Sequence, residues 1–147
     1  MKIAIGCDHG AYELKETFKK HLEENGVEYV DFGTNSTESV HYPIYAKAVC
    51  KAVQNKEADY GVLLCSTGIG MSIAANKHRG IRAALCGDLY SAKFTRLHND
   101  SNVLCVGALV TGVGLAKEIL DTFINTEFMG GRHQTRVDMI SEIENGQ

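Results

Sequence analysis

Short apolar segments and amphipathic helical segments alternate along the whole of this 147-residue chain. The apolar runs have the length of buried strands, and the segments between them repeat apolar side chains at helical spacing. This alternation implies parallel strands joined by right-handed helical crossovers, with helices on both faces of the sheet. The expected strands cover residues 2–7, 27–32, 60–64, 81–86 and 103–106, and the expected helices cover residues 11–25, 44–54, 71–77, 88–97, 115–124 and 132–144.

We therefore expect a single α/β domain over residues 1–147, with a three-layer, Rossmann-like, doubly wound fold. Its sheet is predicted to have five parallel strands in the order 2-1-3-4-5. In that order the winding reverses between strands one and three, and ligands bind outside the carboxyl ends of the strands at such a reversal. The two loops expected there are residues 7–10, Cys7-Asp8-His9-Gly10, and residues 65–70.

The second of these loops, Cys65-Ser66-Thr67-Gly68-Ile69-Gly70, leads from a strand into a helix. A glycine-rich turn of this kind offers free backbone N–H groups and the positive end of a helix dipole. Such an environment binds anions and lowers the pKa of a thiol. The loop therefore has the features of an anion cradle that carries its own base, and burial as a small apolar side chain is the alternative for Cys65.

The other cysteines do not form a recognisable framework. The chain has five, an odd number, and none lies in a C-x-x-C pair, so neither a disulfide framework nor a zinc site is expected. We expect Cys7, Cys50, Cys86 and Cys105 to be small buried apolar side chains.

Charge and hydropathy exclude several classes of protein. A net charge of −3 gives no broad footprint for nucleic acid. No apolar run reaches the ~18 residues of a transmembrane helix. The first strand begins at Lys2 without a preceding signal peptide, so we expect a cytoplasmic protein.

A dinucleotide site is the main alternative for the glycine-rich loop. Asp88 lies 20 residues beyond Gly68, where an acidic residue would bind a ribose hydroxyl. However, Ile73 stands where the third glycine of that fingerprint belongs, and the fingerprint follows a first strand rather than a third. We therefore disfavour a nucleotide cofactor.

Several other polar residues, within and outside these loops, are candidates for the site. His98 lies between a helix and strand five, at the amino ends of the strands and opposite the crevice, so it is either a surface residue or a contributor to the crevice of another subunit in a symmetric dimer. Arg132 and Arg136 are four residues apart and share a helix face, where they form either a phosphate clamp or a solvated surface. Asp8 is either a site residue or the cap of the following helix.

Four motifs occur here in one chain and in order: Gly6-Cys7-Asp8-His9, Cys65 to Gly70, Leu97-His98-Asn99-Asp100, and Gly131-Arg132-His133-Gln134-Thr135-Arg136. Together they resemble the type B ribose-5-phosphate isomerases, from about Lys2 to Glu144. The broader family also includes galactose-6-phosphate isomerase subunits and allose-6-phosphate isomerases.

The resemblance implies an aldose–ketose isomerase that needs neither metal nor cofactor. Carried over by motif, Cys65 is the base that moves a proton between C2 and C1, and His98, assisted by Thr67, opens the furanose ring. The backbone from Ser66 to Gly70 steadies the enediolate. The residues implied to contact the substrate are Asp8 and Asn99 at the sugar, Tyr42 at the pocket wall, Ser66, Gly68, Ile69 and Gly70 in the loop, and His9, Arg132 and Arg136 at the phosphate.

The resemblance also implies a homodimer, or a tetramer built from it, with active sites shared between subunits. His98, Arg132 and Arg136 would then come from the partner subunit. The implied reaction interconverts D-ribose 5-phosphate and D-ribulose 5-phosphate in the pentose phosphate pathway. The alternatives are a six-carbon phosphosugar, either allose 6-phosphate or galactose 6-phosphate, and a non-catalytic module that binds a phosphorylated ligand or nucleotide.

Two positions depart from the pattern of the family. Ser66 stands where some relatives have glycine, which is tolerable if only the backbone N–H is used. Leu109 stands where several relatives carry an arginine, so one polar contact with the substrate is missing from the expected set.

Overall fold

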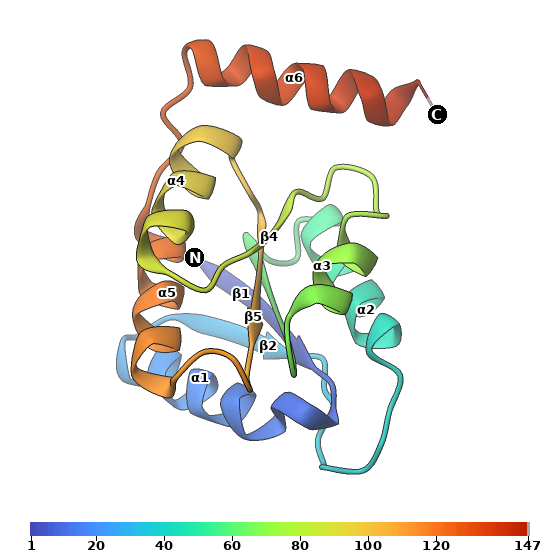
Figure 1. Ribbon diagram of the computed structural model, residues 1–147, viewed down its shortest axis with the longest axis vertical. Coiled ribbons are helices and arrows are strands. Elements are labelled where there is room, and N and C mark those ends of the chain that lie inside the picture. The colour runs from blue at the N-terminus through green and yellow to red at the C-terminus, as the bar shows by residue number, and fades with distance from the viewer. Residues whose placement is uncertain (147) are drawn as a thin grey trace.

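The computed structural model describes residues 1–146 as alternating strands and helices (Figure 1). A short 3-10 turn, η1 (His9–Ala11), precedes the first α-helix. The elements in chain order are β1 (Lys2–Cys7), α1 (Tyr12–Glu24), β2 (Glu28–Asp31), α2 (Tyr42–Gln54), β3 (Tyr60–Cys65), α3 (Ile69–Ala75), β4 (Ala83–Leu85), α4 (Leu89–Asn99), β5 (Val103–Gly107), α5 (Val113–Asn125) and α6 (Arg132–Asn145).

The five strands form one parallel sheet, which confirms the predicted α/β class, but their order is β2-β1-β3-β5-β4. The predicted order 2-1-3-4-5 is therefore wrong for the last two strands. β5 is apolar and fully buried along its whole length, which suits the interior of a sheet covered on both faces. β4 has three residues and is partly exposed, which suits an edge. The winding still reverses between β1 and β3, so the predicted crevice keeps its place.

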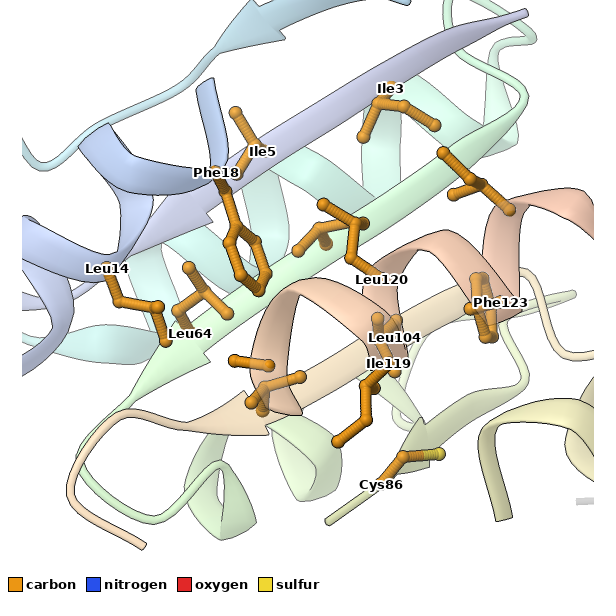
Figure 2. Packing of buried hydrophobic residues seen from close by; sticks show 14 of the residues in the cluster. Ile3, Ile5, Leu14, Phe18, Leu64, Cys86, Leu104, Ile119, Leu120 and Phe123 are labelled. Carbon is orange, nitrogen blue, oxygen red and sulfur yellow. The ribbon is translucent and has the colours of Figure 1, made fainter. Parts of the chain in front are cut away.

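Helices cover both faces of the sheet, with α1, α4 and α5 on one face and α2 and α3 on the other (Figure 1). Successive side chains of β1 point to opposite faces, so that Ile3 and Ile5 pack with Phe18 while Ala4 packs with Val49. Figure 2 shows the first of these two layers, in which side chains of α1 and α5 project onto the strands.

Helix α6 stands apart from the three layers (Figure 1). Near its start, His133 and Val137 are buried, and near its end the Glu144 carboxylate accepts a hydrogen bond from the Gly80 N–H at 3.0 Å. A cavity of about 660 Å³ lies between α6 and the rest of the domain, and Ile140 and Ile143 form part of its wall. The helix therefore bridges α4 and the loop before β4, leaving an open space beneath it.

No helix within residues 1–146 combines the length and the hydropathy that crossing a membrane requires.

The Phe18→Ala variant is expected to lose about 3–5 kcal/mol of unfolding free energy, because a fully buried ring leaves a cavity in the core. Urea unfolding followed by circular dichroism measures this loss. The control is Ile44→Ala on the exposed side of α2, which should change the unfolding free energy by less than about 0.5 kcal/mol. Equal losses in the two variants would contradict this assignment of the core.

Candidate functional site

The two loops predicted at the crevice do meet at the carboxyl ends of β1 and β3. The Asp8 N–H donates to the Leu64 carbonyl at 3.1 Å, continuing the contact between the two strands. Gly10 packs directly against the Ser66 hydroxyl, and a side chain at position 10 would collide with it. The two loops therefore lie side by side as the predicted winding requires, and the roles of their residues stay predictions.

Cys65 is the last residue of β3, and its sulfur accepts a hydrogen bond from the Gly68 N–H at 3.1 Å. The Gly68 amide therefore points directly at the sulfur of Cys65. The turn that aims this donor has Gly68 at φ +76°, a left-handed conformation that glycine adopts without strain. The amides of Ala108 and Leu109 donate to the carbonyls of Cys65 and Ser66 at 2.9 and 3.0 Å, fixing the loop to the end of β5.

The four other cysteines are buried and free, as expected. Burial raises the pKa of Cys7 to about 11, that of Cys50 to about 12 and that of Cys86 to about 11, and it raises the pKa of Cys105 well above its usual value. Of the cysteines in the described part of the chain, Cys65 is the one whose sulfur accepts a backbone N–H. No three His, Cys, Asp or Glu side chains within residues 1–146 converge as metal ligands would.

Thr67 and Tyr42 make further contacts with the Cys65 loop. Thr67 accepts the Ile69 N–H at its hydroxyl oxygen, 3.2 Å away, which leaves its own O–H proton for another acceptor. The ring of Tyr42 lies against Gly70, where a Cβ would come within 2.6 Å of the ring. Thr67 and Ile69 also line a cavity of about 330 Å³ with Leu85 and Val110, whereas Tyr42 contacts the loop at Gly70.

His9 is held in a defined orientation at the same edge of the sheet. Its Nδ1 accepts the Val40 N–H at 3.1 Å, so the ring proton of the neutral imidazole lies on Nε2. Asp8 accepts the Gly10 N–H at 3.0 Å and caps η1, as the capping alternative predicted. The pair therefore offers one Nε2–H donor and one buried carboxylate beside the Cys65 loop.

His98 lies at the opposite end of the sheet, as predicted, but inside the last turn of α4 rather than in a loop. Cys65 pairs with Gly107 at the end of β5, whereas Val103, where β5 begins, pairs with Gly61. Four residues of strand correspond to about 13 Å, so a single chain does not bring His98 to the Cys65 sulfur.

A second cluster surrounds His98. Its ring stacks on that of His133 with centroids 4.0 Å apart and an interplanar angle of 10°, and the ring of Phe94 lies in a T-shaped arrangement with its centroid 4.9 Å away. His133 is 5% exposed and its Nε2 has no hydrogen-bond partner among the described residues. Burial lowers the pKa of His133, and the nearby charges of His98, Arg132 and Arg136 act in the same direction.

The predicted site residues thus fall into two groups. The first group is Asp8, His9, Tyr42, Cys65, Ser66, Thr67, Gly68, Ile69 and Gly70, and the second is His98, Asn99, Arg132 and Arg136.

The sequence analysis assigned no role to His133, although this residue stands between the two arginines of a quoted motif. It also did not identify Val40, whose backbone N–H holds the ring of His9.

Thiol alkylation should distinguish Cys65 from the other cysteines. At about pH 8, iodoacetamide is expected to modify one thiol rapidly, because thiols with pKa values near 11 or above stay protonated and buried. Mass spectrometry of the peptides identifies the modified residue, and Cys65→Ala should remove the fast phase. Rapid modification of Cys50 or Cys86 in the native protein would contradict this assignment.

A model of the family described as Ribose/Galactose Isomerase matches residues 3–140. Ribose-5-phosphate isomerase B of Escherichia coli strain K12 is 52% identical over 143 residues, which cover 97% of this chain and 96% of that protein.

Solved structures are similarly close. The ribose-5-phosphate isomerase B of Clostridium thermocellum superposes with a TM-score of 0.98 at 51% identity, covering 99% of both chains. That of Mycoplasma genitalium, with bound ribulose-5-phosphate, has a TM-score of 0.94 at 36% identity and covers 99% of this chain and 97% of its own.

Proposed function

Because the chain belongs to the ribose/galactose isomerase family, we propose that it is an aldose–ketose isomerase that interconverts D-ribose 5-phosphate and D-ribulose 5-phosphate. The observation that carries the proposal is the Cys65 sulfur, placed at the crevice of a doubly wound sheet with a backbone donor directed at it. The name of the E. coli relative and the ligand of the M. genitalium structure support the five-carbon substrate.

Ring opening is the first step of the forward reaction. Ribose 5-phosphate is a furanose closed between C1 and the oxygen on C4, so C1 has no free carbonyl. His98 donates a proton to the ring oxygen while a solvent water accepts the proton of the C1 hydroxyl, which breaks the bond between C1 and the ring oxygen and releases the open aldehyde. A histidine exchanges protons near neutral pH and suits this step.

Proton transfer follows at the Cys65 loop. The thiolate of Cys65 removes the proton on C2, and the electron pair forms the C1–C2 double bond of an enediolate. The charge that develops on O1 lies over the amides of the loop, where a well-placed donor lowers the activation barrier by about 3 kcal/mol. Moving a proton from O2 to O1 and returning the cysteine proton to C1 completes the ketose.

The phosphate anchors the far end of the substrate. The Nε2–H of His9 is the donor from one cluster, and the guanidinium groups of Arg132 and Arg136 supply charge from the other. Binding energy at the phosphate then serves to orient C1 and C2 above the sulfur. Asp8, Tyr42 and Asn99 complete the contacts to the sugar.

A two-fold dimer completes the site. Within one chain the two clusters lie at opposite ends of the parallel strands, so each active site takes one cluster from each subunit. We further propose that the dimer works in the cytoplasm, in the pentose phosphate pathway.

Replacing Cys65 with alanine is expected to abolish isomerisation, because no other group at the sulfur's position can remove the C2 proton. Steady-state turnover of ribose 5-phosphate without added metal measures the effect, and circular dichroism checks the fold. Cys50→Ala, which removes a buried thiol from α2, is the matched control and should retain activity within about twofold.

The same assay on allose 6-phosphate and galactose 6-phosphate tests the substrate. A higher kcat/KM on either six-carbon sugar would overturn the five-carbon proposal. Near-native turnover in Cys65→Ala would remove Cys65 from the role of base.

Mixing two inactive variants should restore activity if sites are shared. Cys65→Ala and His98→Ala subunits, once exchanged, form hybrid dimers in which one of the two sites has both residues intact. Activity of the mixture is expected to rise toward about one quarter of the wild-type value, since half of the dimers are hybrids with one good site. No recovery despite exchange shown by native mass spectrometry would argue for sites within one chain.

A further inference from the structure

Asp100 ends α4 in an unusual conformation and is held by two arginines. It follows His98 and Asn99, and its φ of +47° lies in the left-handed region that most residues avoid. Its Oδ1 accepts from Arg96 Nη1 at 2.8 Å, and its Oδ2 accepts from Arg82 Nη2 at 3.1 Å. Each oxygen of one carboxylate therefore faces a different guanidinium group.

The same arginines bind the backbone on both sides of Asp100. Arg82 Nε donates to the carbonyls of Asn99 and Asp100 at 3.2 and 2.9 Å, and Arg96 Nη1 donates to the Ser101 carbonyl at 2.6 Å. The last carbonyls of a helix have no partner within the helix and must find one elsewhere. Here they find charged donors, so the end of α4 is fixed by ionic hydrogen bonds as well as by packing.

Arg96 is anchored in turn to the core. It is 4% exposed, its Nη2 donates to the Tyr60 hydroxyl at 2.9 Å, and its Nε donates to the Thr126 carbonyl at 3.2 Å. The guanidinium carbon lies 4.7 Å from the centre of the Tyr60 ring. Because β3 begins at Tyr60, the end of α4 is tied through Arg96 to the sheet.

The side chains of His98 and Asn99 have no comparable hydrogen bonds within residues 1–146. The ring of His98 touches Phe94 and His133 through its faces and edges, which leaves its nitrogens for the substrate. Its direction therefore depends on this ring packing and on the backbone that carries it, and that backbone is held by Arg82, Asp100 and Arg96.

We propose that Asp100, bridged by Arg82 and Arg96, is a positioning residue that orients His98 for the opening of the sugar ring. This inference rests on the proposed function and on the role of His98 within it. In this proposal Asp100 acts through His98 rather than on the substrate itself.

A chemical difference between the two substrates gives a specific test. Ribulose 5-phosphate is open-chain, because its C5 oxygen is esterified and no five-membered ring can close on C2. Removal of its C1 proton by Cys65 therefore needs no ring opening and is seen as deuterium uptake at C1 in D₂O by NMR. Turnover of ribose 5-phosphate needs both steps.

Asp100→Asn keeps a side chain that tolerates the left-handed conformation but removes the charge between the arginines. We expect turnover of ribose 5-phosphate to fall roughly 10- to 100-fold, while deuterium uptake into ribulose 5-phosphate stays within about threefold of wild type. The matched control is Asp121→Asn, which removes a partly exposed carboxylate paired with His21 and should leave both rates unchanged.

An equal fall in both rates, or no fall in either, would overturn the positioning role. If Asp100→Asn fails to fold, Arg82→Met removes the more exposed of the two arginines that bind Asp100. This variant must then show the same selective loss of ribose 5-phosphate turnover. Wild-type protein that is inactive in both assays would instead overturn the proposed function, which separates the two failures.

Discussion

The close approach between the Cys65 loop and the end of β5 is the constraint on which the site depends. A Cβ on Gly107 would lie 2.5 Å from the Thr67 carbonyl oxygen, and one on Gly68 would lie 3.0 Å from the Val106 carbonyl carbon. Only glycine at both positions lets the loop pass so near to the neighbouring strand. The resulting turn points the Gly68 N–H at the sulfur, so this close approach sets the position of the Cys65 sulfur together with that of its backbone donor.

Parallel strands impose the second constraint, because they place all their carboxyl ends at one edge of the sheet. The Cys65 loop, Asp8 and His9 gather there, while the helix that carries His98 ends at the other edge. No loop in the described chain carries His98 across that distance. The isomerase chemistry proposed here therefore needs two subunits for a geometric reason rather than for stability alone.

Buried charges hold each half of the site in place. Lys15 is fully buried, and its ammonium group binds both carboxylate oxygens of Asp31 at 2.7 and 2.8 Å. Asp31 accepts the Gly33 N–H, at the start of the loop that runs to Val40 and its contact with His9. At the end of α4, the ion pair between Arg96 and Asp100 fixes the backbone that carries His98 in a similar way. Because a charge out of water is tolerated only with its partners in place, both anchors allow little choice of geometry.

The amino-acid sequence by itself determined the local elements, the parallel sheet and the meeting of the two loops beside Cys65. Those features follow from short-range periodicity, glycine positions and the rule that ligands bind where the winding reverses. The tertiary structure alone decided that β5 rather than β4 lies beside β3, that His133 stacks on His98, and that the Val40 amide orients His9. Each of these is a contact between residues far apart in the chain, and it depends on packing and burial that no local pattern encodes.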